Sequence, residues 1–159
     1  MNQDFIEQLY RDEGCKLVPY RCPQGYWTIG VGRNLETNGL SGKEKELFFG
    51  NSMSDKEVIN ALLERGISKR EAHLMLLDDV IDTLFLLSGK LNLSGHDEAR
   101  VFVLINMAYQ MGVNGLLKFK KTLTYFNAKD YESCAYEMLD SVWAHQTPER
   151  AARLSIQMA

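Results

Sequence analysis

The chain has 159 residues and a mass of 18.2 kDa, which suits one domain or one domain with two lobes. Hydrophobic residues make up 45% and charged residues 25%, close to the averages of globular proteins, so disorder and low-complexity sequence are excluded. The net charge of −3 and the pI near 5.6 give no basic footprint for nucleic acid.

The sequence predicts neither a membrane span nor an export signal. The most apolar region, 74–87, is interrupted by three aspartates, whereas a span needs roughly 18 uninterrupted apolar residues. The first seven residues lack the basic and apolar parts of a secretory signal. We therefore expect the protein to accumulate in the cytoplasm. Three cysteines without a CxxC pair predict free thiols rather than disulfides or a zinc site.

The first third of the chain is predicted to hold one helix and a small sheet. Residues 4–13 carry apolar side chains at helical spacing, and Gly14 is the expected end of this helix. Between residues 17 and 34, β-branched and aromatic residues alternate with Pro and Gly. This pattern predicts an antiparallel hairpin or meander that turns near residues 23–25. Residues 34–53, rich in Gly and Asn, are predicted to be loop with room for one helical turn.

The remainder is predicted to be helical. Capping boxes at Ser54–Glu57 and Ser68–Glu71 begin a helix that ends near Gly66 and a long helix that runs through Leu87. Ser94 is expected to open a central core helix over 99–111. Shorter helices are expected at about 116–126 and 130–142, and a last one at Thr147-Pro148, with Thr147 as N-cap. The stripe expected to be apolar on the long helix consists of Leu74, Leu77, Ile81 and Leu84.

These elements predict an α+β fold that is mainly α. We expect a small sheet-containing lobe at about 14–68 and a helical lobe formed by about 1–13 and 88–159. The long helix at about 69–87 is expected to join them.

Most common catalytic and metal-binding motifs are missing from the sequence. The histidines His73, His96 and His145 are scattered, without an HExxH motif or a Cys/His pair at metal-ligand spacing. There is no GxSxG motif, P-loop or dinucleotide fingerprint. A catalytic pair of a cysteine and a histidine that are distant in sequence but close in the folded protein stays open as an alternative.

Glu13, Cys22 and Thr28 are the more informative set. Glu13 closes the first predicted helix, where the negative end of the helix dipole disfavours a charged carboxyl, as a general acid requires. Cys22 and Thr28 follow on the predicted hairpin, so both can face the same cleft. Taken singly, each of these residues has an ordinary structural explanation: a solvated carboxylate, a small buried thiol and a strand threonine.

The spacing of these residues resembles the phage lysozymes (endolysins) of glycoside hydrolase family 24. In that family a Glu is followed after eight residues by Asp or Cys, and after five more by Thr, which Glu13, Cys22 and Thr28 match without a gap. The resemblance continues at 25–32, at 105–112 and at 143–151, so it spans about residues 5 to 153. It implies a lysozyme-like two-lobed fold and a muramidase, with no cofactor and no metal.

The resemblance also implies roles for individual residues. The expected reaction is hydrolysis of the β-1,4 bond between N-acetylmuramic acid and N-acetylglucosamine in peptidoglycan, with Glu13 protonating the leaving oxygen. Arg150 matches an arginine that pairs with this Glu. Tyr109 and Thr122 match positions that contact sugar, and Asn34 matches another more loosely. Gln110 and Trp143 are expected to be packing partners.

Two departures from the family pattern matter. With Cys22 in place of Asp, two mechanisms stay open: Cys22 as thiolate nucleophile with retention, or Cys22 and Thr28 positioning water with inversion. Arg33 replaces a common family histidine that pairs with an Asp, here matched by Asp79. An Arg33–Asp79 pair would not titrate near neutral pH.

The resemblance implies a phage or prophage endolysin, expected to be a monomer, that lyses the host at the end of the phage cycle. Stored in the host cytoplasm, it would need a holin to reach the wall, with peptidoglycan glycan strands as its partner. Alternatives are a lytic transglycosylase, against which Cys22 and Thr28 count, and a non-catalytic wall-binding module, against which Glu13 counts.

Overall fold

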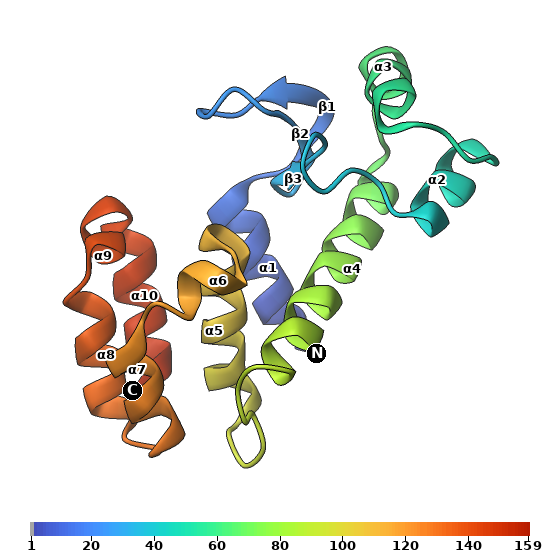
Figure 1. Cartoon of the computed structure of the whole chain (residues 1–159). Helices are drawn as coiled ribbons and strands as arrows, with labels where there is room; N and C mark the ends of the chain where they lie inside the picture. The colour runs from blue at the N-terminus through green and yellow to red at the C-terminus, as the bar shows by residue number, and fades with distance from the viewer. Residues whose placement is uncertain (1) are drawn as a thin grey trace. The chain divides into compact units, whose positions relative to one another are not determined.

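The computed structural model describes residues 2–159, which form helices and one small antiparallel sheet (Figure 1). This confirms the predicted α+β, mainly α class. The chain divides into two compact units, which are described separately. We call Ile6–Asp79 the sheet unit, and Val80–Ala159 together with the residues up to Phe5 the helical unit. The lobe boundaries given above stay a prediction.

The sheet unit contains three strands in the order β1-β2-β3, all antiparallel, with helices around them. The hairpin between β1 and β2 turns at the predicted place, where the Gly25 amide donates to the Cys22 carbonyl at 2.8 Å. The helix over 4–13 and the helices after Ser54 and Ser68 are also confirmed. The elements are α1 (Gln3–Glu13), β1 (Lys16–Arg21), β2 (Trp27–Gly30), β3 (Arg33–Asn34), α2 (Gly42–Phe49), α3 (Asp55–Arg65) and α4 (Lys69–Ser88), of which α1 and α4 extend into the helical unit.

The prediction that residues 34–53 are loop was wrong, because they contain α2. Ser41 and Glu44 form a complete capping box, and Gly50 ends the helix in the left-handed conformation. The buried Phe48 of this helix joins a core that includes Ile29, Leu62 and Met75. Ser41 and Glu44 have the same spacing as the capping boxes that begin at Ser54 and Ser68, but the Gly and Asn residues around them indicated a loop.

Gly66 fixes the connection between α3 and the sheet. Its φ of 68° and ψ of −166° lie in a region that only glycine adopts readily. A Cβ at this position would lie 2.6 Å from the Leu17 carbonyl oxygen. The next amide, that of Ile67, donates to the same oxygen at 2.8 Å. The main chain after α3 therefore approaches β1 more closely than any side chain would permit.

The buried face of α4 differs from the predicted stripe. Ile81 is 56% exposed, whereas Ala72, Met75, Leu76 and Val80 are almost fully buried. These buried residues follow the same three-to-four spacing, shifted along the helix from the predicted positions. Because α4 is apolar on several sides, its periodicity alone did not define which side is covered.

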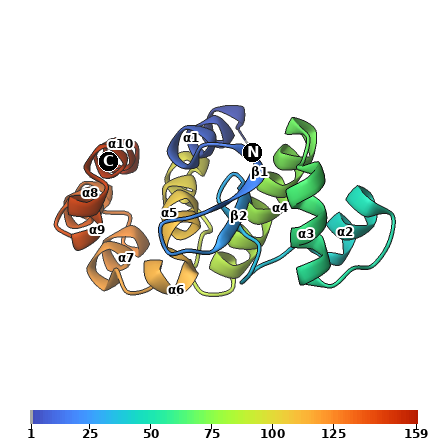
Figure 2. The same ribbon diagram turned by 90° about the horizontal axis from the view of Figure 1, so that it is seen from above.

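The helical unit is built around α5, whose residues 102–108 are all buried. Its short helices α8 and α10 pack against each other, and α7 packs against α8 (Figure 2). The helix expected over 116–126 begins later, as α7, and the short α6 that precedes it was not predicted; the helix expected over 130–142 ends earlier and is followed by α9. The elements are α5 (Glu98–Met111), α6 (Val113–Leu116), α7 (Lys120–Asn127), α8 (Tyr131–Leu139), α9 (Val142–Gln146) and α10 (Pro148–Met158).

Two predicted caps in the helical unit were also wrong. Asp97, not Ser94, caps α5, and its carboxylate accepts from the Arg100 amide at 3.0 Å. Thr147 precedes α10 without a side-chain cap, since its hydroxyl donates back to the Trp143 carbonyl at 3.0 Å. Pro148 alone supplies the predicted start signal. Over residues 2–159, no helix is long and apolar enough to cross a membrane.

Candidate active site

Glu13 is the last residue of α1, as predicted. Gly14, with φ of 71°, ends the helix, and its amide donates to the Tyr10 carbonyl at 2.9 Å. The Glu13 side chain is partly buried and lies against the main chain of Gly32, between β2 and β3. A Cβ on Gly32 would be 3.5 Å from Glu13 Oε2. The Glu13 carboxylate therefore lies beside the main chain at Gly32, at a distance at which a Cβ would make an ordinary van der Waals contact.

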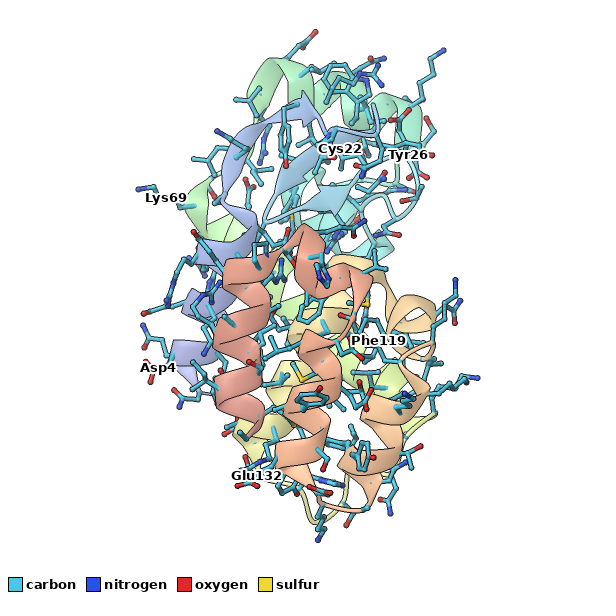
Figure 3. All side chains as sticks on the ribbon, turned by 90° about the vertical axis from the view of Figure 1, so that its left-hand side faces the viewer. Asp4, Cys22, Tyr26, Lys69, Phe119 and Glu132 are labelled. Carbon is cyan, nitrogen blue, oxygen red and sulfur yellow. The ribbon has the colours of Figure 1, made fainter. Side chains whose placement is uncertain are left out.

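Cys22 and Thr28 lie on the β1–β2 hairpin, on either side of its turn. Figure 3 labels Cys22 and Tyr26 at this turn. The Cys22 amide donates to the Tyr26 carbonyl at 3.0 Å, and the Thr28 hydroxyl donates to the same oxygen at 3.1 Å. Desolvation raises the pKa of the Cys22 thiol, but the nearby main-chain amides of Tyr26, Gln24 and Gly25 and the Thr28 side chain together bring the pKa below its usual value. The hairpin thus favours a thiolate.

The strand register places a row of residues on one face of the sheet. Tyr20 pairs with Thr28, and Thr28 pairs with Asn34. Paired residues on neighbouring strands share a face, and so do residues two apart on one strand. Cys22 directly follows the end of β1, and its amide still donates to the Tyr26 carbonyl across the hairpin, so the same alternation puts it on the face of Tyr20. The next pair, Ile29 with Arg33, is buried on the opposite face.

Tyr20 is the site residue that sequence analysis missed. Burial raises the pKa of its phenol, and the negative charges of Cys22 and Glu13 raise it further. The ring therefore lies within electrostatic reach of both predicted catalytic groups. The period-two alternation of a strand was the available signal, because it puts residue 20 on the face of residue 22.

Asn34 has a clear structural role in addition to its predicted contact with sugar. Its Oδ1 accepts from the amides of Glu36 and Thr37, both at 2.9 Å. Its carbonyl accepts from the amide of Asn38 at 3.1 Å. The side-chain oxygen is thus committed to the turn after β3, and the contact of Asn34 with sugar stays a prediction.

Arg33 forms the expected ion pair with Asp79, with Nε to Oδ2 at 2.9 Å and Nη2 to Oδ1 at 2.8 Å. It also makes a two-pronged contact with Glu44 that was not predicted, at 2.9 and 3.0 Å, and donates to the carbonyls of Gly39 and Met75. Burial alone would lower the pKa of Arg33, but the two carboxylates raise it well above its ordinary value. The guanidinium stays charged at any pH the fold survives.

In the helical unit, Arg150 lies at the start of α10 and is only 7% exposed. Its Nε donates to Asn106 Oδ1 at 2.9 Å, and its Nη2 donates to the Asn106 carbonyl at 3.1 Å. Asn106, fully buried in the middle of α5, therefore fixes the direction of the guanidinium. The pairing of Arg150 with Glu13 stays a prediction.

The remaining residues expected at the site lie on α5, α7 and α9. Tyr109 on α5 is partly buried, and Thr122 on α7 is buried. The packing expected for Gln110 and Trp143 is confirmed, because the indole donates to Gln110 Oε1 at 2.8 Å. Phe119, labelled in Figure 3, meets the same indole edge-on with ring centres 6.2 Å apart.

Among residues 2–159, no cluster of three or more His, Cys, Asp or Glu side chains could hold a metal ion. The three cysteines are free thiols: Cys15 and Cys22 reach the surface, and Cys134 is buried. The groups among the described residues that could take part in a reaction are thus the Glu13 carboxyl, the Cys22 thiol and the Thr28 hydroxyl. An acid next to a base or nucleophile is the pattern of glycosidic bond cleavage.

Comparison with known proteins gives consistent results. The phage lysozyme family matches residues 10–155. Probable T4-type lysozyme 1 of Dictyostelium discoideum is 32% identical over 158 residues, which cover 97% of this chain and 92% of the relative. Probable T4-type lysozyme 2 of the same organism is 30% identical with the same coverage.

A third relative is a much longer protein. The pre-baseplate central spike protein Gp5 of Enterobacteria phage T4 is 30% identical over 161 residues, which cover 98% of this chain and 27% of that protein. All three alignments run over nearly the whole length of the present chain, including the hairpin and α10. The chain therefore belongs to the phage lysozyme family and is a peptidoglycan hydrolase of the lysozyme type.

Proposed function

We propose that this lysozyme hydrolyses the β-1,4 bond between N-acetylmuramic acid and N-acetylglucosamine, and that it serves host lysis at the end of a phage cycle. The observation that carries the chemistry is the grouping of Glu13 with Cys22 and Thr28 in the sheet unit. Glu13 is the general acid, and its proton passes to the glycosidic oxygen as the bond to the anomeric carbon breaks.

Cys22 and Thr28 act on the other side of the anomeric carbon. In the inverting route, water attacks that carbon and gives a proton to the Cys22 thiolate, while the Thr28 hydroxyl orients the water. In the retaining route, the thiolate itself forms a bond to carbon, and water later displaces it. The lowered pKa of Cys22 supports both routes, since each begins from the thiolate.

The other site residues bind the substrate or position the general acid. Asn34, Tyr109 and Thr122 contact the sugars, and Arg150 positions Glu13. The protein acts as a monomer on glycan strands. It is held in the host cytoplasm until a holin opens the membrane. The long helix at 69–87 links a sheet-containing lobe to a helical lobe.

Glu13→Gln tests the acid directly. The amide cannot donate the required proton, so clearing of a peptidoglycan suspension should fall by at least about a hundredfold, within the range for general acid catalysis. Binding to insoluble peptidoglycan should persist. Asp12→Asn, at the neighbouring carboxylate of α1, is the matched control and should keep its activity. Full activity in Glu13→Gln would remove the proposed mechanism.

The anomeric configuration of the first product separates the routes. Proton NMR of purified glycan strands during cleavage should show the α-anomer first if Cys22 and Thr28 position water. An initial β-anomer would assign Cys22 as the nucleophile. A 1,6-anhydro product would instead show a lytic transglycosylase.

A further inference from the structure

Tyr20 shares the catalytic face of the sheet. It lies opposite Thr28 on the neighbouring strand and two residues before Cys22, and Thr28 lies opposite Asn34. The face that Tyr20 occupies therefore carries the proposed water-positioning or nucleophilic groups and a proposed sugar contact. A sugar bound between Glu13 and Cys22 would lie near Tyr20, because the charges of both groups act on the Tyr20 hydroxyl.

The hydroxyl of Tyr20 is a donor that the fold does not use. Within residues 2–159, it makes no hydrogen bond, although the charges of Glu13 and Cys22 both act on it. Other tyrosine hydroxyls in the chain do have partners, as Tyr10 has His73 at 2.9 Å and Tyr131 has His96 at 2.9 Å. A partly buried phenol ordinarily finds an acceptor, so a partner supplied from outside the chain suits this position.

The protonation state suits a donor. Burial and two negative neighbours raise the pKa of Tyr20 above its ordinary value near 10, so the phenol keeps its proton at neutral pH. Glycan strands present hydroxyl, ring and acetamido oxygens, all of which accept hydrogen bonds. A glycan strand bound at this face can therefore supply an acceptor for the Tyr20 hydroxyl.

We propose that Tyr20 is a substrate-contacting residue, whose hydroxyl donates a hydrogen bond to an oxygen of the sugar bound between Glu13 and Cys22. This inference rests on the proposed function, because it takes those two residues as the reacting groups. It assigns Tyr20 to the binding of the reacting sugar rather than to the core of the sheet unit.

Tyr20→Phe removes the hydroxyl alone. On purified glycan strands, kcat/KM should fall about tenfold, the effect of losing one neutral hydrogen bond to a ligand. The melting temperature should stay unchanged, because no internal hydrogen bond is lost. Tyr10→Phe is the matched control: it loses the bond to His73, so its melting temperature should fall while kcat/KM stays at the wild-type level.

A binding measurement separates this inference from the proposed mechanism. In a Glu13→Gln background, which prevents cleavage, adding Tyr20→Phe should weaken binding of uncleaved glycan strands about tenfold, measured by calorimetry. Unchanged binding together with unchanged kcat/KM would overturn the role of Tyr20. So would a melting temperature lowered as much as in Tyr10→Phe. If Glu13→Gln alone keeps full activity, the proposed function fails, but a tenfold loss of binding in Tyr20→Phe would still show the contact.

Discussion

Each unit of the molecule buries one arginine, and the two are held in different ways. In the sheet unit, Arg33 lies between the carboxylates of Glu44 and Asp79. In the helical unit, Arg150 is directed by the neutral side chain and the carbonyl of Asn106. Both guanidinium groups are nearly inaccessible, at 6% and 7% exposed.

The difference shows what each arginine contributes. Arg33 lies on β3, and its side-chain hydrogen bonds end on α2, on α4 and on the Gly39 carbonyl of the intervening loop, so it ties these parts of its own unit together. Asn106 orients the Arg150 guanidinium with a neutral side chain and a carbonyl. Arg33 between its two carboxylates is thus structural, whereas the proposed function gives Arg150 a further task, the positioning of Glu13.

Replacing each arginine by methionine tests this comparison and should give the largest effect. Arg33→Met leaves two carboxylates without their cation, one of them the buried Glu44, and should lower the free energy of unfolding by about 3–5 kcal/mol. Arg150→Met removes the two hydrogen bonds that Arg150 donates to Asn106, and this loss should lower the free energy of unfolding by about 1–3 kcal/mol. Urea unfolding of both variants measures the difference.

Activity should show the opposite order. At a temperature where both variants are folded, Arg150→Met should lose more peptidoglycan hydrolysis per folded molecule than Arg33→Met. Equal activity losses, or a stability loss that is larger for Arg150→Met, would contradict the division of roles.

A pair of glycines sharpens the comparison with a smaller effect. Gly66 in the sheet unit and Gly112 in the helical unit have similar positive φ values, 68° and 79°. A Cβ at Gly66 would meet the Leu17 carbonyl at 2.6 Å, whereas a Cβ at Gly112 would meet nothing within 4 Å. Backbone strain should therefore lower the free energy of unfolding of both alanine variants by about 1–3 kcal/mol. In Gly66→Ala, the clash should lower it by about 1–3 kcal/mol more.

Thermal unfolding of the two variants gives the comparison directly. If Gly112→Ala were as unstable as Gly66→Ala, the contact of the α3–α4 connection with β1 would not be the source of the extra cost. Wild-type protein in the same scan provides the reference for both.

The sequence predicted most elements that carry explicit end signals. Ser54, Ser68 and Gly14 each mark a boundary that the structure confirms. The sequence could not separate α6 from α7, because no Pro or cap divides that stretch. It also misplaced the covered side of α4, where apolar residues occur around much of the helix and tertiary packing decides which are buried.

The candidate site was partly predictable in the same way. The spacing of Glu13, Cys22 and Thr28 identified these residues, while the structure added their local partners. Glu44 as the second partner of Arg33 was not predictable, since it required α2, which sequence analysis treated as loop. Tyr20 needed the register of the hairpin, which periodicity suggests but only the pairing with Thr28 defines.

The smallest expected effect concerns His96 in the helical unit, where stability should depend on pH. Its ring stacks on Phe126 with centres 3.9 Å apart, and its Nδ1 is 2.9 Å from the Tyr131 hydroxyl. Burial lowers the pKa of His96, and the Lys129 charge lowers it further, while Asp97 opposes them. A lowered pKa means that the unfolded chain takes up the proton first. Stability should therefore fall as the pH drops from the pKa of histidine in the unfolded chain, near 6.5, to its pKa in the folded protein.

His96→Gln, which does not titrate, should remove this part of the dependence of stability on pH and change the melting temperature by less than about 2–4 °C. His145→Gln, at an exposed histidine, is the control, and a slope that persists in His96→Gln would assign the pH dependence to other groups.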